Sequence, residues 1–170
     1  MSWSRSLGAT AALALPLGLA GCFQPLYSEA AHPGLVDKVR AIEVAPIKDR
    51  IGHYLADDLT SDFNGTGQTP PPKYRLTVTV STGTSTPTVN SLTNVATSAT
   101  VTAEAEFILK KVDGDEKVVE GKAVAAAAYD RSQQRYADLR AERDAEIRLA
   151  RSLSDDISQR VAAGIAAHSS

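Results

Sequence analysis

The most constraining feature of this 170-residue sequence is a long alternation of apolar and polar residues near its middle. From about Leu92 to Lys110, most odd positions are small or apolar, and most of the residues between them are polar or charged. Such an alternation is typical of a long antiparallel strand with one solvated face. Asp113-Gly114 suits a tight turn, so Val118 to about Tyr129 is predicted to return as the partner strand. The apolar face comprises Val95, Ala99, Val101, Ala103, Ala105, Phe107 and Leu109.

The N-terminal half of the domain is predicted to contain a strand and then a helix. Alternating residues within Lys38 to Val44 indicate the strand, which Pro46 ends. Asp49 is predicted to cap a helix that runs through Phe63. Asn64-Gly65 is a suitable stop, because both residues tolerate left-handed conformations. The apolar stripe of this helix recurs every four residues, at Ile51, Leu55 and Leu59.

A second strand and a terminal helix complete the predicted elements. Tyr74 to Ser81 alternates like a half-buried strand, and Thr82 to Ser91, rich in Ser, Thr, Gly and Pro, is predicted to be a loop. The final segment has helical spacing, with an apolar stripe at Leu149, Leu153, Ile157, Val161 and Ile165. Opposite charges four residues apart lie on its solvent side, at Asp144/Arg148, Arg151/Asp155 and Asp156/Arg160.

The element order is therefore β-α-β-β-β-α, which places the chain in the α+β class. The first β-α-β unit is expected to join parallel strands by a right-handed crossover, and the next two connections suit antiparallel neighbours. Two amphipathic helices can then cover one face of a four-stranded mixed sheet. The predicted fold is a two-layer sandwich.

The N-terminus carries a secretory signal that ends in a lipoprotein box. Arg5 precedes an apolar run from Leu7 to Leu19, which is too short to span a membrane, and Leu19-Ala20-Gly21-Cys22 follows. This pattern predicts cleavage after Gly21 and N-acyl and S-diacylglycerol lipids on Cys22. The alternative is a plain secretory signal with an incidental cysteine. Phe23, rather than an aspartate, follows Cys22, which favours the outer membrane of a Gram-negative cell, with the protein anchored on its periplasmic side.

The sequence is thus divided into three parts. Residues 1–21 are the predicted signal peptide, residues 22–34 a lipidated tether and residues 35–170 a single domain. After residue 21, 17 basic and 20 acidic residues remain, a net charge of −3 that argues against nucleic acid as a partner.

The reactive residue types give no catalytic or metal-binding pattern. His32, His53 and His168 lack metal-ligand spacing, and the chain has one cysteine, Cys22. We therefore predict no enzyme activity, no metal and no cofactor other than the covalent lipid. The most unusual polar sequence runs from Tyr129 to Glu146, and Arg and Tyr are enriched at interfaces. One interpretation is a helix start rich in ion pairs, and the other is a partner-docking surface of Arg131, Arg135, Tyr136, Arg140 and Arg143.

Two segments carry a resemblance to a known family. The lipoprotein box followed by Phe23-Gln24-Pro25-Leu26-Tyr27, and the run from Tyr129 to Glu146 that leads into an amphipathic terminal helix, resemble the lipopolysaccharide-assembly lipoprotein family LptE. The resemblance covers most of the mature chain in element order, but its specific matches lie at the two ends. Between Lys73 and Val124 only the pattern matches.

The resemblance implies a non-enzymatic partner of the outer-membrane β-barrel LptD. Members of the family are plugs in the barrel lumen that assist its assembly and the passage of lipopolysaccharide to the outer leaflet. The family also implies contact with lipopolysaccharide through basic residues. By position alone, the candidates here are the lysines around the predicted hairpin tip, although lysines there also serve solubility or edge protection. They are Lys110, Lys111, Lys117 and Lys122.

Two other functions fit parts of the sequence. A lipid-anchored adaptor subunit of another periplasm-spanning transport complex could share the anchor and the sandwich. A lipid-anchored hydrolase is disfavoured by the lack of a nucleophile and base.

Overall fold

A computed structural model of the protein describes residues 33–65, 69–86, 89–90, 95–114 and 116–168. Residues 35–170 form one compact unit. The described elements begin with α2 (Leu35–Arg40), β1 (Ile42–Val44) and α3 (Asp49–Asn64). They continue with β2 (Tyr74–Ser85), β3 (Val89–Asn90), β4 (Val95–Ala96), β5 (Ser98–Lys111), β6 (Lys117–Asp130) and α4 (Arg135–His168).

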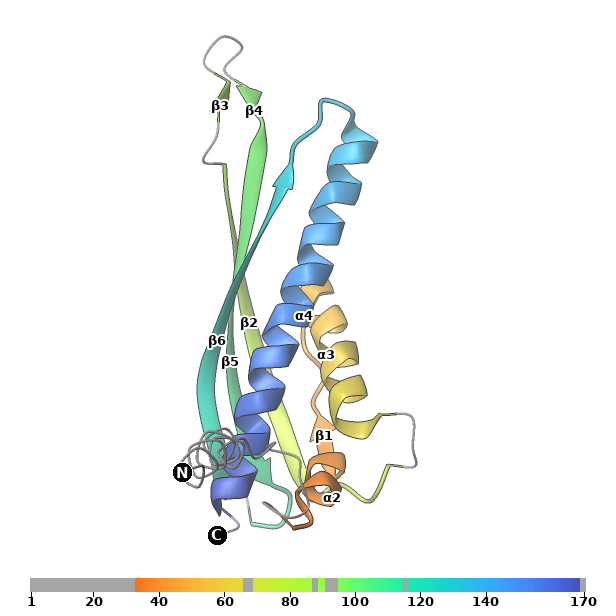
Figure 1. The fold of residues 1–170 in the computed structure, drawn as a ribbon, viewed down its shortest axis with the longest axis vertical. Helices are drawn as coiled ribbons and strands as arrows, with labels where there is room; N and C mark the ends of the chain where they lie inside the picture. Colours follow the sequence, from red (N-terminus) through yellow and green to blue (C-terminus); the bar gives the residue numbers. More distant parts are fainter. Residues whose placement is uncertain (1–32, 66–68, 87–88, 91–94, 115, 169–170) are drawn as a thin grey trace, which may run out of the picture. The chain divides into compact units, whose positions relative to one another are not determined.

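The predicted two-layer α+β sandwich is confirmed. The main sheet has the order β1-β2-β5-β6, and β3 pairs with β4 in a separate two-stranded sheet. The pairing of β1 with β2 is parallel, while β2–β5 and β5–β6 are antiparallel, as the predicted connections require. Helices α3 and α4 lie on the same side of the main sheet, and α4 runs antiparallel to β6 (Figure 1).

The predicted alternation in β5 sets one face of this sheet. From Ala99 to Leu109 every odd residue is buried, and small residues of β6 come close to them from the neighbouring strand. The terminal helix contributes its predicted stripe, and all five of its large residues are buried. The main buried residues at this interface are Val101, Phe107, Leu109, Ala123, Ala127, Leu149, Leu153, Ile157, Val161 and Ile165.

The first strand is shorter than predicted, because its expected beginning is helical. Residues 35–40 form α2, whose Leu35 and Val39 are buried four residues apart. This helical spacing overrides the short alternation that Lys38 to Val44 presents. Only Ile42–Val44 pairs with β2, and the prediction of a strand from Lys38 was wrong for its first part.

Two boundaries also differ from expectation. Lys48 is the N-cap of α3 and makes no side-chain cap bond, whereas Asp49 lies in the first turn with φ of 69°, so the predicted Asp49 cap was wrong. The helix ends as predicted, with the Gly65 N–H donating to Ser61 O at 2.9 Å. Strand β2 continues through the predicted loop start to Ser85, because β5 supplies a ladder partner for each added residue.

Helix α4 packs very close to β6 at Gly164. A Cβ atom built on Gly164 would lie 2.1 Å from Cγ2 of Val119, a distance that real side chains do not adopt. Val119 is β-branched and therefore stiff, so it cannot swing away at low cost. The absence of a side chain at Gly164 thus permits this packing distance.

We expect Gly164→Ala to destabilise the fold, although alanine has the higher helix propensity by about 1 kcal/mol. Overpacking against Val119 should lower the free energy of unfolding by about 1–3 kcal/mol, as measured by chemical denaturation. Adding Val119→Ala removes the opposing methyl groups and should recover much of the loss. Equal or higher stability of Gly164→Ala alone would contradict this packing.

Candidate functional site

The chain enters α4 through a short polar turn that its own side chains hold together. Ser132 Oγ accepts the Gln134 N–H at 3.1 Å, and Asp138 Oδ1 accepts the Ser132 N–H at 3.2 Å. Asp138 lies in the first turn of α4, where a negative charge is favourable. It also lies 3.7 Å from the Arg131 guanidinium. Arg131, one of the predicted docking residues, therefore helps to fix the helix start.

Beyond this turn, α4 presents an exposed stripe of arginine and apolar side chains. Tyr136, Leu139 and Ile147 are 74%, 54% and 37% exposed, which is high for residues of their size. The guanidinium of Arg140 lies 5.9 Å from the centroid of the Tyr136 ring, within cation–π range. The first turns of α4 extend past the N-terminal end of α3 (Figure 1). We call this stripe, together with exposed Arg135 at the start of the helix, the α4 docking surface; it consists of Arg135, Tyr136, Leu139, Arg140 and Ile147.

Leu139 and Ile147 were not predicted as docking residues. Their signal was present in the sequence, since positions 136, 139, 140 and 147 fall on one side of a helix. This pattern is hard to recognise because the segment is mostly polar and has too few apolar residues to indicate an apolar stripe.

Arg143, the remaining predicted docking residue, is directed toward α3. Its Nε donates to the Tyr54 hydroxyl at 2.8 Å. One turn further on, Glu146 accepts two hydrogen bonds from Arg50, each at 2.7 Å, and this pairing raises the pKa of Arg50. Arg143 therefore lies on the same side of α4 as the stripe, but its guanidinium joins the two helices.

Two of the predicted lipopolysaccharide-contact lysines, Lys110 and Lys111, line a hollow on the sheet. Its volume is about 350 Å³, and Arg75 adds a third cationic side chain. Ile108 and Val112, which are 37% and 44% exposed, supply apolar surface beside these charges. Thr77 completes the lining.

Several of these cationic groups already have acidic partners. Lys111 Nζ lies 2.7 Å from Glu116, and this hydrogen bond raises the pKa of Lys111 and lowers that of Glu116. Arg75 pairs with Glu43 at 3.0 Å. All these side chains are at least partly exposed, so each pair is weak and open to exchange with another anion.

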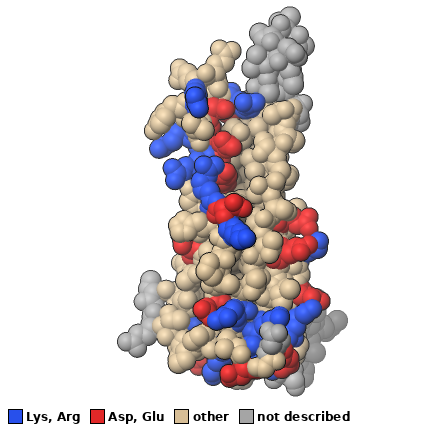
Figure 2. Space-filling view, turned by 180° about the vertical axis from the view of Figure 1, so that it is seen from behind, with Lys and Arg blue, Asp and Glu red and all other residues tan. Residues whose placement is uncertain are grey.

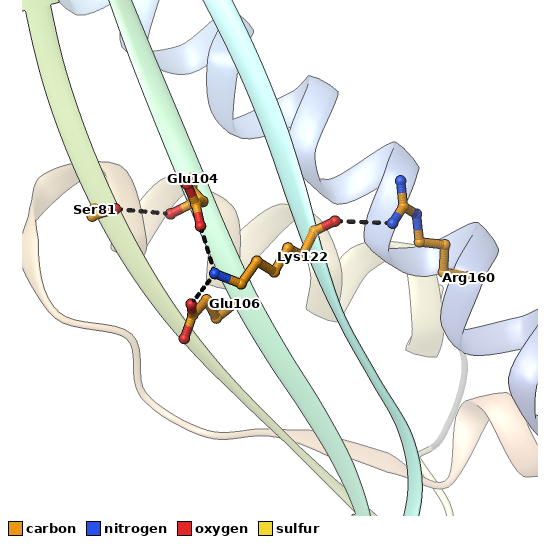
Figure 3. Close-up of polar contacts among 5 residues, drawn as sticks. All are labelled: Ser81, Glu104, Glu106, Lys122 and Arg160. Atoms are coloured by element: carbon orange, nitrogen blue, oxygen red, sulfur yellow. Dashed lines mark hydrogen bonds and ion pairs between the residues drawn. The ribbon is translucent and has the colours of Figure 1, made fainter.

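The other two lysines lie outside the hollow. Lys117 pairs with Glu120 at 2.5 Å. Lys122 lies between Glu106 and Glu104 on β5, with its Nζ 2.6 and 3.0 Å from their carboxylates (Figure 3). Hydrogen bonding to both acids raises the pKa of Lys122. The structure therefore separates the four lysines into a pair that lines the hollow and a pair that lies outside it.

The outer edge of β6 is closed by two arginines of α4. Arg148 Nη2 donates to the carbonyl of Ala128 at 3.0 Å, and Arg160 Nη1 donates to that of Lys122 at 2.9 Å (Figure 3). Each arginine is also held by the aspartate four residues before it, at 2.9 Å for Asp144 and 2.8 Å for Asp156. Two of the three predicted helix pairs thus form and also orient side chains toward the sheet.

On the face of the molecule opposite the view of Figure 1, groups of Lys, Arg, Asp and Glu side chains are separated by uncharged surface (Figure 2). Exposed Thr77, Thr79 and Ser81 on β2 and Thr102 on β5 contribute to the uncharged surface. Within the described ranges no three His, Cys, Asp or Glu side chains are placed to hold a metal ion. None of the helices in those ranges is long and apolar enough to cross a membrane.

These features define a small α+β domain with an arginine-rich helical stripe and a polar sheet face. The sequence model of the family LptE, described as lipopolysaccharide-assembly, matches residues 39–161. This match extends over most of the chain, and the protein therefore belongs to the LptE family of lipopolysaccharide-assembly proteins. A comparison with curated protein sequences found no match.

Solved structures with the same fold come from bacterial proteins. A candidate lipoprotein from Caulobacter crescentus CB15 is 21% identical, with a TM-score of 0.61, over 76% of this chain and 94% of its own. Rare lipoprotein B from Shewanella oneidensis is 13% identical, with a TM-score of 0.56, over 76% and 98% respectively. At these identities the two likenesses establish the fold. Cys22 and the Phe23–Tyr27 segment lie outside the described residues, so the lipidation prediction stays a prediction.

Proposed function

We propose that this protein is an outer-membrane lipoprotein that partners the β-barrel LptD, as its plug and assembly factor in lipopolysaccharide transport to the outer leaflet. Membership of the LptE family supports the process. The observation that carries the partnership is the α4 docking surface, which exposes Tyr136 and Leu139 beside Arg135 and Arg140. Tyr and Arg are the residue types that most often dominate binding energy at interfaces.

The polar sheet face fits the same role. The lumen of a large barrel is polar and can be filled by a plug. The exposed positions of β2 from Thr77 to Ser85 are mainly Thr and Ser, and such a surface can lie against a polar wall without burying unpaired charge. We infer that the protein acts by binding rather than by catalysis.

The test of this function is an affinity pull-down of the tagged lipoprotein from its native outer membrane in mild detergent, followed by mass spectrometry. A large β-barrel recovered at equal stoichiometry supports the proposal. Recovery of the lipoprotein alone, or with an inner-membrane transporter, contradicts it and favours the adaptor.

Charge reversal on the α4 docking surface should weaken this association. We expect Arg135→Glu/Arg140→Glu to lower barrel recovery at least tenfold, equivalent to about 1.4 kcal/mol, because two arginines of the contact become repulsive or unpaired. Arg143 is avoided because it bonds to Tyr54. The matched control is Arg40→Glu/Lys73→Glu, which changes the same charge at exposed positions away from the stripe. Equal losses in both variants would show that net charge, not this surface, determines recovery.

Membrane attachment depends on the proposed lipids of Cys22. Each buried acyl methylene contributes about 0.8 kcal/mol, so several chains make the anchor effectively permanent. We expect metabolic labelling with palmitate to mark the wild-type protein and not Cys22→Ala. A label of equal intensity on Cys22→Ala would place the modification elsewhere and refute the lipoprotein box.

We propose that the hollow, rather than the whole set of predicted lysines, contacts lipopolysaccharide. Its cationic groups match phosphate, and Ile108 and Val112 match acyl chains. Lys110→Gln/Lys111→Gln should reduce lipopolysaccharide binding by the full lipoprotein severalfold in low salt, where charge attraction is strongest. Lys117→Gln/Lys122→Gln is the control, since it removes the same charge at lysines that lie outside the hollow. An equal or larger loss in the control would contradict this assignment.

A further inference from the structure

Strand β2 has a long open edge. On one side it pairs with β5 along its whole length, from Tyr74 to Ser85. On the other side β1 pairs with only its first three residues, Tyr74 to Leu76. The chain then leaves the sheet through Pro46, which has no N–H to continue a ladder. Residues 77–85 of β2 thus extend for about 30 Å beyond the end of β1.

The hydrogen-bonding groups on this edge can be assigned. The Ala45 N–H donates to Leu76 O at 2.9 Å, so Leu76 directs its backbone polar groups to the β1 side. In a strand these groups alternate in direction, and every second residue after Leu76 faces the same way. Among the described residues, no backbone hydrogen bond reaches this side of the strand after Leu76. The residues concerned are Val78, Val80, Thr82 and Thr84.

This edge also lacks the features that discourage strand addition. Native sheets protect edges with charged residues, proline, bulges or covering elements. Residues 77–85 contain no charged residue and no proline, and their ladder with β5 has no register shift. The β6 edge of the same sheet differs, because Arg148 and Arg160 bind its carbonyls. Two carbonyls of the β6 edge therefore bind dedicated side chains, whereas no such contact is found on the β2 edge among the described residues.

We propose that residues 77–85 of β2 pair with an extended, uncharged segment of the barrel partner. This segment adds a strand beside β2, in the position that β1 occupies as far as Val44. This rests on the proposed function. The strands of a closed barrel have no free edges, so the added segment comes from a loop inside the lumen.

The chemistry of the edge determines what the segment can be. Because residues 77–85 carry no charge, a charged segment would lose hydration without gaining a counter-ion. On the helix side, Val78 is buried and Val80 half-buried, whereas Thr82 and Thr84 are exposed. The opposite side carries exposed Thr77, Thr79 and Ser81. The matching strand is apolar on alternate residues beside Val78 and Val80 and uncharged polar elsewhere.

The first test removes one edge donor from the full lipoprotein. Thr82→Pro deletes an N–H that faces the open side, while the bonds from odd residues to β5 remain. We expect barrel recovery to fall at least tenfold relative to wild type, with the circular dichroism of the purified lipoprotein unchanged. The matched control is Thr82→Val, which keeps the N–H and should retain recovery. Wild-type recovery by a folded Thr82→Pro variant would overturn the proposal.

A second test does not depend on how well the proline variant folds. A photo-reactive benzoylphenylalanine at position 82 should cross-link to a luminal segment of the barrel in the native outer membrane. Cross-links to a second copy of this chain, or to the chain's own residues 1–34, would overturn the proposal by naming another occupant. If the wild-type protein recovers no barrel, the proposed function itself fails. If wild type recovers it and position 82 cross-links elsewhere, the edge pairing alone fails.

Discussion

Helix α4 lies against the sheet as closely as side chains allow, and the rest of the structure depends on this contact. Alanines and glycines form much of the interface, including Ala123 and Ala127 on β6 and Gly164 on the helix. Within β6, Gly121 leaves room for the Phe107 ring, since a Cβ there would lie 2.8 Å from Cζ. Large residues of α4 fill the remaining space. The core is therefore thin, and close approach compensates for its few aromatic side chains.

The close packing of α4 on the sheet determines where its exposed side chains point, both on the docking surface and at the edge of β6. Its stripe of buried leucine, isoleucine and valine fixes the rotation of the helix, so that Tyr136, Leu139 and Arg140 face outward. The same rotation directs Arg148 and Arg160 to the edge of β6. The docking surface and the arginine contacts at the β6 edge thus both result from the way α4 packs on the sheet.

Many charged side chains of this protein lie in local pairs of opposite sign, not in large patches of one sign. Lys122 pairs with Glu104 and Glu106, and Lys111 pairs with Glu116. These acids neutralise most of the electrostatic attraction that the lysines would exert on a distant anion. Exposed pairs of this kind contribute little to stability. The group around Lys122 keeps the middle of the sheet face near neutrality, which suits close contact with a polar surface, and the Lys111 pair does the same at the β5–β6 hairpin.

The sequence predicted the elements whose signal is long and missed those whose signal is short. The alternation in β5 and the stripe of α4 extend over many residues, and the structure confirms both. Residues 38–41 present only a brief alternation, which cannot be distinguished from the helical spacing of Leu35 and Val39 without knowledge of the core.

The candidate site was predicted less well than the fold, because partners distant in sequence decide each side chain's role. Arg143 appeared equivalent to Arg140 until its bond to Tyr54, 89 residues earlier, was seen. Lys122 likewise appeared equivalent to Lys110 before β5 brought two glutamates beside it.

The two arginines that close the β6 edge also relate the length of a helix to that of a strand. Arg148 and Arg160 are 12 residues apart, about 18 Å along a helix, while the carbonyls of Ala128 and Lys122 are six residues apart, about 20 Å along a strand. A single inserted residue between the arginines would turn the second by about 100° away from the strand. Relatives should therefore vary in length at the hairpin tip or in the connection between β6 and α4, and keep residues 122–128 and 148–160 free of insertions and deletions.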